Sequence, residues 1–187
     1  MFNRKLQLSF LQKQGLLPHH ILLDFGCGPC YAGEHFVSYL DSGNYYGCDH
    51  KSEIIRIAEK RLTDLNLMGK MPNLSVVQDF ELPYVGLKFD FIWLYSVFTH
   101  LSLLRARECV IKLLKCLKNN GLFLVTINLN HIYEARNDQP QSRYEILDVR
   151  YPFDHFQEII CDIANVKLFP SEDTAHFFTE RVVEIKK

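Results

Sequence analysis

Three glycines, a proline and two cysteines crowd into the ten residues DFGCGPCYAG, from Asp24 to Gly33. An apolar run, Ile21–Leu23, precedes the stretch and a helical pattern follows it, so we expect a loop between a buried strand and a helix. Gly26 and Gly28 let the backbone turn sharply and approach a ligand closely. Two chemistries fit this loop. Its amides could bind a carboxylate or phosphate, or its Cys-x-x-Cys pair could serve metal binding or thiol–disulfide exchange.

Acidic residues stand at the ends of the next two expected strands. Asp49 follows the second strand about 20 residues beyond the glycine loop, where nucleotide-type folds bind ribose hydroxyls. Asp79 follows the third strand and is placed to accept from the exocyclic amine of adenine, with Phe80 as an apolar neighbour. His50 either flanks the same adenosine or faces solvent. These positions together favour a ligand that contains adenosine.

The residues around the loop distinguish between two such ligands. A dinucleotide fingerprint, Gly-x-Gly-x-x-Gly, requires glycine where this chain has Tyr31. Asp24 stands directly before the loop, where a carboxylate disfavours a pyrophosphate but suits an amino group or a positive sulfonium. S-adenosylmethionine (SAM) carries both groups, and a carboxylate for the loop amides. The residues therefore favour SAM, whose demethylated product is S-adenosylhomocysteine (SAH).

Strand and helix patterns alternate along the chain. Helices are expected over residues 4–14, 31–40, 52–65, 103–118 and 153–164, and strands over residues 21–25, 45–48, 74–78, 89–95, 122–127, 166–169 and 177–185. The sequence Asn119-Asn120-Gly121 predicts a left-handed cap that ends the fourth helix. The alternation predicts a three-layer α/β sandwich with a mostly parallel, twisted sheet and an antiparallel C-terminal strand. Such sheets bind ligands outside the carboxyl ends of their strands.

The motifs resemble those of the class I, seven-stranded SAM-dependent methyltransferases. The first four motifs of that family are similar, in order, to ILLDFGCGPCYAG, YYGCDHKSEIIRIAEKRL, LSVVQDFELPY and KFDFIWLYSVFTHL. The following helix and strand of the family resemble VIKLLKCLKNNGLFLVTI. The resemblance runs from about residue 16 to residue 128, and Cys30 stands where the family usually has a third glycine. The segment SVFTHL is similar to the corresponding segment of family members that methylate small molecules or sugars.

The resemblance implies a seven-stranded sheet, SAM as cofactor and methyl transfer to a small-molecule or sugar-type acceptor. The expected cofactor-binding residues are Asp24, Gly26, Cys27, Gly28, Tyr31, Asp49, His50, Asp79, Phe80, Leu94 and Tyr95. Tyr31 either covers the methionine moiety or belongs to the core. The backbone near Leu94 and Tyr95 is expected to face the amino group of the cofactor.

The acceptor side offers one candidate base and one irregular segment. His100, just after the fourth strand, is either a general base or a histidine packed at a helix start and bonded to backbone. His35, on an apolar helix stripe, is expected to be structural. Residues 128–150 are either a solvated surface loop or a lid whose arginines hold an anionic acceptor. The side chains of interest there are His131, Tyr133, Arg136, Arg143, Tyr144 and Arg150.

Two alternatives to an enzyme of this class stay open. Cys27 and Cys30, together with Cys48 and His50 on the neighbouring strand, would suit a metal or redox site, although no metal is expected beside a cofactor loop. The same fold could also bind SAM or SAH without catalysis, as a sensor or as part of a complex. Stoichiometric zinc would favour the first alternative, and cofactor binding without turnover would favour the second.

Length and composition set the remaining expectations. A chain of 187 residues suggests one domain over residues 1–187, and 48% hydrophobic with 23% charged residues is ordinary for a globular protein. The formal net charge of -1 gives no sign of a nucleic-acid partner. Six cysteines are expected to be free thiols in a reducing compartment. No signal peptide or bilayer-spanning run is seen, so we expect a cytoplasmic protein.

Overall fold

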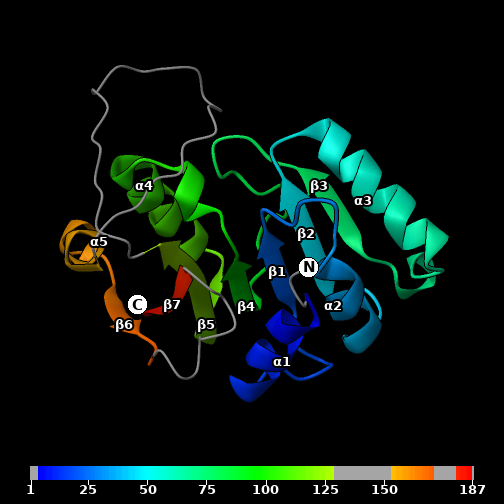
Figure 1. Ribbon diagram of the computed structural model, residues 1–187, viewed down its shortest axis with the longest axis horizontal. Helices are drawn as coiled ribbons and strands as arrows, with labels where there is room; N and C mark the ends of the chain where they lie inside the picture. The colour runs from blue at the N-terminus through cyan, green and yellow to red at the C-terminus, as the bar shows by residue number, and fades with distance from the viewer. Residues whose placement is uncertain (1–3, 129–152, 171–179, 187) are drawn as a thin grey trace.

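The computed structural model describes residues 4–128, 153–170 and 180–186, which contain a seven-stranded sheet with helices packed on it (Figure 1). The strands are β1 (Leu22–Phe25), β2 (Tyr45–Asp49), β3 (Asn73–Val76), β4 (Phe89–Leu94), β5 (Leu117–Asn128), β6 (Asn165–Leu168) and β7 (Glu180–Lys186). The helices are α1 (Lys5–Lys13), α2 (Gly33–Tyr39), α3 (Ser52–Asp64), α4 (Leu103–Leu114) and α5 (Phe153–Ile160), with short 3-10 turns η1 (Met68–Lys70) and η2 (Phe98–His100).

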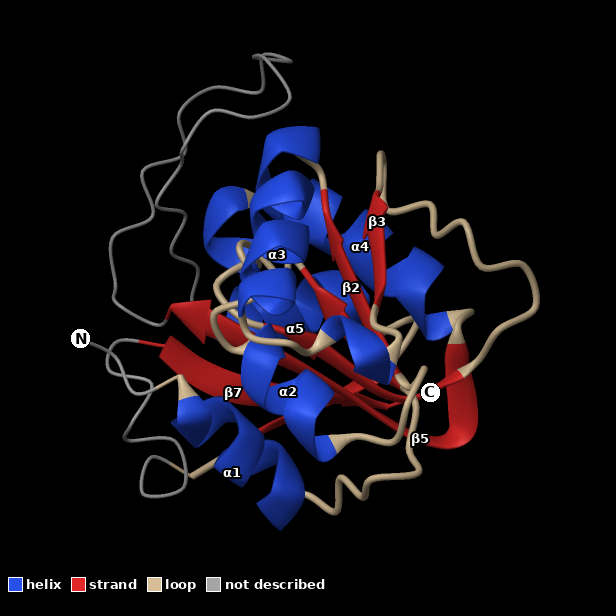
Figure 2. Ribbon diagram, turned by 90° about the vertical axis from the view of Figure 1, so that its right-hand side faces the viewer, coloured by secondary structure: helices blue, strands red, loops and turns tan. Residues whose placement is uncertain are grey.

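The order of strands across the sheet is β3-β2-β1-β4-β5-β7-β6. The first five of these pair in parallel, whereas β7 pairs antiparallel with both β5 and β6. Figure 2 shows β5 and β7 side by side in this arrangement. The predicted sheet, mostly parallel with an antiparallel C-terminal strand, is confirmed. The strand order reverses between β1 and β4, so the crevice beside their carboxyl ends is the expected place for a ligand.

The strands bury both faces because successive side chains point to opposite sides. On β4, Ile92 and Leu94 join the core beneath α4 and α5, whereas Phe91 and Trp93 join the core beneath α1, α2 and α3. Trp93 is fully buried, and its indole N–H donates to Gln7 Oε1 of α1 at 2.9 Å. The two cores on opposite sides of one sheet confirm the three-layer sandwich.

The predicted end of the fourth helix is wrong. Helix α4 ends at Leu114 and β5 already begins at Leu117, so the segment expected to be a left-handed cap, Asn119-Asn120-Gly121, is extended strand. Gly121 has no positive φ, but a Cβ on it would lie 3.0 Å from the carbonyl oxygen of Asp90. The glycine therefore serves a close approach of two strands rather than a helix cap. The pairing of β4 with β5 is irregular at the same place.

Smaller differences concern other boundaries and one helix face. Strand β3 ends at Val76, so Asp79 lies in the following turn rather than at the strand tip. On α2 the buried residues include Phe36 and Val37, whereas His35 is partly exposed, so the expected apolar stripe through His35 is displaced.

In the described ranges, no helix has the length and hydropathy needed to cross a membrane.

Candidate functional site

The glycine loop after β1 is fixed to the end of β2. The backbone N–H groups of Gly26 and Cys27 both donate to the carbonyl oxygen of Cys48, at 2.8 and 2.9 Å. Gly26 has φ +79°, and a Cβ there would lie 2.5 Å from Cγ2 of Val97 in the loop after β4. Glycine is therefore required at this position for both its conformation and the close approach of the second loop.

Asp49 links the loops that follow three neighbouring strands. Its Oδ2 accepts from the backbone N–H of Gly28 at 3.3 Å, and its Oδ1 accepts from that of Lys51 at 3.1 Å. Its carbonyl oxygen accepts from the N–H of Val77 at 2.9 Å. The predicted ribose acid thus stands between the glycine loop and the turn after β3, and the structure brings these predicted residues together.

Asp24 is buried, with only 5% of its surface exposed. The Tyr45 hydroxyl donates to its Oδ2 at 2.8 Å. Burial raises the pKa of Asp24 to about 7, the Tyr45 hydrogen bond opposes that shift, and the charge of Asp49 adds to it. A positive ligand group next to this carboxyl would favour its ionised form. Asp24 therefore combines a buried position with a proton that it can release near neutral pH.

Cys30, in place of the third glycine of the family, points into the core. It has φ +54° and is fully buried, and its Sγ lies 3.4 Å from the Tyr45 hydroxyl. The following helix approaches so closely that a Cβ on Gly33 would lie 2.5 Å from the same hydroxyl. The Cys30 side chain is therefore part of the packing behind the loop.

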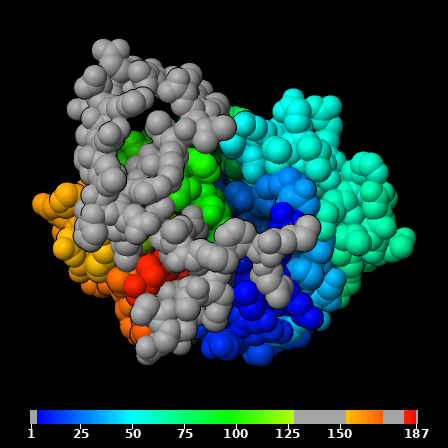
Figure 3. Space-filling view, viewed as in Figure 1, coloured from blue at the N-terminus to red at the C-terminus, as the bar shows by residue number. Residues whose placement is uncertain are grey.

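Tyr31 does not belong to the core, which corrects that alternative. It is 40% exposed and is flanked by two guanidinium groups: Arg4 lies 3.4 Å and Arg61 4.6 Å from the ring centroid. Arg61 on α3 also pairs with Glu34. In the view of Figure 3, blue atoms of the N-terminal part of the chain lie beside the cyan atoms of the α3 region. Two guanidinium groups therefore flank the ring of Tyr31, and the side chain stays partly exposed.

The turn after β3 carries the residues predicted for adenine. Asp79 and Phe80 both have positive φ, +50° and +62°. Phe80 is buried, and its ring centroid lies 6.1 Å from that of Phe25 at the end of β1. Asp79 Oδ1 accepts from Arg105 at 3.1 Å. Sequence reasoning missed Arg105, because nothing in the pattern of α4 indicates which loop its polar face contacts.

Two histidines face the same edge of the sheet. His50 lies with Nδ1 3.2 Å from Asp49 Oδ1, and its side chain is exposed to solvent by 40%. Burial lowers the pKa of His50, the carboxylate of Asp49 opposes this, and the positive charge of Lys51 lowers it further, with a smaller contribution from the neighbouring His100. His100 itself is exposed at the end of η2, so the expectation of a packed histidine is wrong.

The end of β4 completes this edge. Leu94 is buried, whereas Tyr95 is half-buried with its ring centroid 6.1 Å from that of Trp93. Ser96 has φ +54°, and its N–H donates to Thr126 Oγ1 at 2.8 Å. The chain therefore turns sharply after Tyr95, next to the glycine loop that Val97 contacts.

The cysteines do not build a metal centre. In the part of the chain that the structure describes, no three His, Cys, Asp or Glu side chains are grouped so that they could hold a metal ion, and Cys27, Cys30, Cys48 and His50 all lie in that part. All six cysteines are free, as expected. The pKa of Cys27 is raised, by its hydrogen bond with Cys30 and by burial. A protonated thiol is a weak nucleophile and a weak metal ligand.

The predicted acceptor-side segment lies almost entirely outside the described residues. This applies to His131, Tyr133, Arg136, Arg143, Tyr144 and Arg150. The lid hypothesis and the surface-loop hypothesis for residues 128–150 therefore both stay predictions.

Comparison with known proteins agrees with this geometry. A family model for a methyltransferase domain matches residues 23–123. Magnesium protoporphyrin IX methyltransferase from Synechocystis PCC 6803, solved with SAM bound, is 15% identical with a TM-score of 0.68, and 98% of this chain and 78% of that chain are covered. The YcgJ protein from Bacillus subtilis is 14% identical with a TM-score of 0.70, and 97% of each chain is covered. The cyclase SpnF is 15% identical with a TM-score of 0.66, covering 97% of this chain and 79% of its own.

The fold is that of an α/β protein in which a glycine loop follows β1, next to the point where the strand order reverses. The family match covers more than half of the chain, which therefore belongs to the family of methyltransferase domains. The resemblance to class I SAM-dependent methyltransferases is thereby confirmed.

Proposed function

We propose that this protein transfers a methyl group from SAM to a small-molecule acceptor. The observation that supports the proposal is the set of hydrogen bonds that join the loops after β1, β2 and β3 at the Cys48 carbonyl and at Asp49. Because the strand order reverses between β1 and β4, a ligand bound at these loops would lie where open α/β sheets bind theirs.

Each part of the cofactor has a proposed partner. The loop from Gly26 to Tyr31, including Cys27 and Gly28, lies against the methionine moiety, and Asp24 faces its positive charge. Asp49 accepts the ribose hydroxyls, with His50 beside it. The pair Asp79–Phe80 lies at the adenine, and the backbone of Leu94–Tyr95 lies at the amino group. Asp24 and Asp49 supply charged hydrogen bonds, which are stronger than neutral ones.

Methyl transfer from a sulfonium needs alignment more than activation. The donor is already reactive, so the protein contributes chiefly by holding nucleophile, methyl and sulfur in line. We propose a small-molecule or sugar-type acceptor, supported by the motif SVFTHL, and residues 128–150 as the segment beside it. Six free thiols support a reducing compartment such as the cytoplasm.

The binding part of this proposal is tested by calorimetry with SAH. The wild-type protein is expected to bind SAH, and Asp49→Asn to bind it about 10- to 100-fold more weakly, because a charged acceptor for the ribose is lost. Asparagine keeps one oxygen for the Gly28 or Lys51 N–H. The control is Asp64→Asn, an exposed residue of α3 paired only with Lys60 among the described contacts. Unchanged affinity of the Asp49 variant would reject the ribose assignment.

His100 is the proposed general base for an acceptor whose proton must leave. His100→Ala is expected to lower turnover at least about 100-fold with an unchanged SAH affinity, since general bases typically contribute that much. His155→Ala on α5, also an exposed histidine, is the control. An unchanged rate in the His100 variant removes it from the chemistry, and the reaction then needs only alignment.

Non-catalytic binding of SAM or SAH is the second candidate. The cyclase SpnF shares the fold and is named for an activity other than methyl transfer, so the fold alone does not require methylation. Methyl-labelled SAM offered with a broad panel of small-molecule acceptors distinguishes the two. Label in any acceptor supports the transferase. Tight SAH binding with no labelled product across the panel supports the binding protein.

A further inference from the structure

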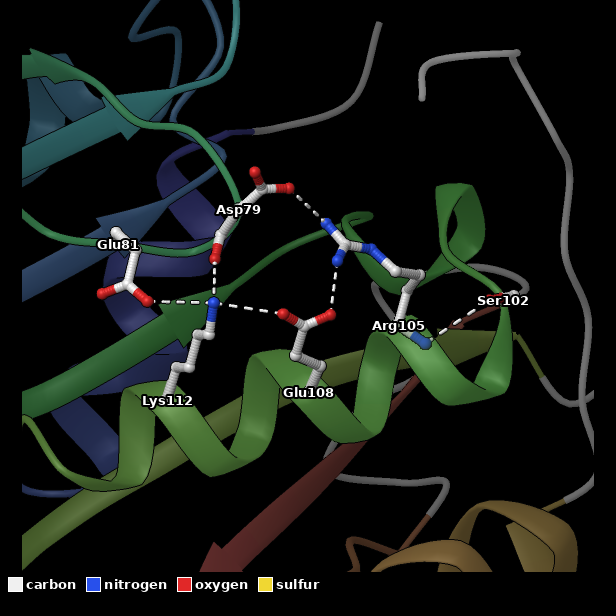
Figure 4. A network of polar contacts seen from close by, with 6 residues as sticks. All are labelled: Asp79, Glu81, Ser102, Arg105, Glu108 and Lys112. Carbon is white, nitrogen blue, oxygen red and sulfur yellow. Dashed lines mark hydrogen bonds and ion pairs between the residues drawn. The ribbon is translucent and has the colours of Figure 1, made fainter. Parts of the chain in front are cut away.

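Helix α4 presents a charged face to the turn after β3 (Figure 4). Arg105, Glu108 and Lys112 are spaced at i, i+3 and i+7, so they lie on one side of the helix. The turn opposite carries two acids, Asp79 and Glu81. Ion pairs join Arg105 to Asp79 and to Glu108, and Lys112 to Glu81 and to Glu108. Five side chains thus form one network between a helix and the turn proposed to bind adenine.

The turn needs support, because its conformation is unfavourable. Asp79 and Phe80 are consecutive residues with positive φ, which costs side chains other than glycine free energy. A hydrogen bond from the N–H of Glu81 to the carbonyl oxygen of Gln78, 2.9 Å long, closes the turn. Lys112 Nζ donates to the carbonyl oxygen of Asp79 at 2.7 Å. Lys112 therefore holds the backbone of the turn, at the strained position itself.

Arg105 contacts both residues proposed for the adenine. Its Nη2 donates to Asp79 Oδ1 at 3.1 Å, and its guanidinium carbon lies 4.5 Å from the centroid of the Phe80 ring. Glu108 accepts from the other terminal nitrogen of the same guanidinium and so fixes its plane. The Asp79 side chain is 38% exposed, and the bond to Arg105 restricts its rotation.

We propose that Arg105 is a positioning residue for adenine recognition, acting through Asp79, and that Lys112 holds the turn beneath it. This inference rests on the proposed SAM-binding function. An ionised carboxylate has about four acceptor sites, so Asp79 can accept from Arg105 and from an exocyclic amine together. A carboxylate already held in orientation loses less entropy when the amine arrives, which improves affinity for ligands that carry that amine.

The inference is tested with SAH and with its inosine counterpart, in which an oxo group replaces the 6-amino group. Arg105→Met keeps much of the apolar stem and removes the guanidinium. It is expected to weaken SAH binding about tenfold, a change of about 1.4 kcal/mol. It is expected to weaken binding of the inosine counterpart much less, so the preference for adenine falls. Arg105→Lys restores charge but not the fork, and recovers only part of the preference.

Arg107→Met is the matched control, because Arg107 is on the same helix and pairs with Asp162 of the α5 side instead. It is expected to keep wild-type affinity for both ligands. The thermal midpoint of Arg105→Met should fall by only a few degrees, since partly exposed ion pairs contribute little to stability.

Two results would overturn the inference: wild-type affinity of Arg105→Met for SAH, or an equal loss of both ligands, which indicates a general disturbance of the turn. If the wild-type protein binds neither ligand, the proposed function itself is rejected, and this inference with it.

Discussion

At the scale of single residues, Asp24 shows how burial makes a carboxyl group titrate near neutral pH. An exposed aspartate is ionised at neutral pH, but burial raises the pKa of Asp24 to about 7 even though the Tyr45 hydroxyl donates to it. A positive ammonium or sulfonium group of a ligand favours the ionised form of Asp24. The carboxyl group must therefore lose its proton before it can pair with that group.

Cofactor affinity should consequently depend on pH. Below about pH 7 the carboxyl of Asp24 is protonated, so affinity for SAM is expected to fall by up to about tenfold for each pH unit, and to level off above pH 7. Asp24→Asn should bind more weakly at pH 8 and lose this dependence. Calorimetry from pH 5.5 to pH 8.5 measures both, with Asp41→Asn in an exposed turn as control. A flat profile in the wild-type protein would contradict the assignment of Asp24.

The raised pKa of Asp24 also makes the stability of the protein depend on pH. Between the usual aspartate pKa and about 7, the native state holds a proton that the unfolded state has released, so the free energy of unfolding falls as pH rises through this interval. Asp24→Asn, which carries no charge, is expected to be more stable than the wild-type protein above pH 7, by on the order of 1–4 kcal/mol. Urea denaturation at pH 5 and pH 8 checks this. A variant less stable than wild type at pH 8 would show that burial does not dominate at Asp24.

At the scale of elements, the loop after β1 depends on the loop after β4. Gly26 and Gly43 both have a positive φ, +79° and +85°, but only Gly26 has a neighbour that a Cβ would strike, Val97. The two glycines therefore separate the cost of backbone conformation from the cost of the close approach.

Gly43→Ala is expected to cost about 1–2 kcal/mol of stability, the penalty of a left-handed conformation alone. Gly26→Ala should cost at least about 1 kcal/mol more, because its methyl group would overlap Val97 and force one of the two loops to move. Urea denaturation of both variants measures the difference, and SAH affinity should fall in the Gly26 variant alone. Equal stabilities would indicate that the loop after β4 yields easily.

Helices and strands could be predicted where the spacing of apolar residues and the residue types of the adjoining loops indicate the same structure. The glycine loop, the strand before it and the acid at the end of β2 were all placed correctly. The end of α4 was not, because Asn119-Asn120-Gly121 is also a good helix cap and the close approach of β4 at Asp90 is invisible in the local sequence. Likewise, the apolar pattern over residues 31–40 predicts both His35 and Phe36 as inward residues of α2, whereas the structure buries Phe36 and Val37 and leaves His35 partly exposed.

At the scale of the whole molecule, the sheet brings together residues that belong to separate segments. The seven strands of one sheet support a single domain over residues 1–187, which stays a prediction. Trp93 in the central strand β4 and Gln7 in α1 are 86 residues apart and share a hydrogen bond. This bond joins α1, at the N-terminal end of the described chain, to the centre of the sheet.

The alternation of strands and helices, the glycine loop after β1 and the acid at the end of β2 could be predicted from the residues alone, because periodicity and short spacings are local properties. Only the tertiary structure decided that Asp24 is buried, that Tyr31 lies between Arg4 and Arg61, and that Arg105 and Lys112 contact the turn after β3. Those facts depend on how helices pack across the sheet, and side chains 26 and 33 residues apart carry no local signal of their contact.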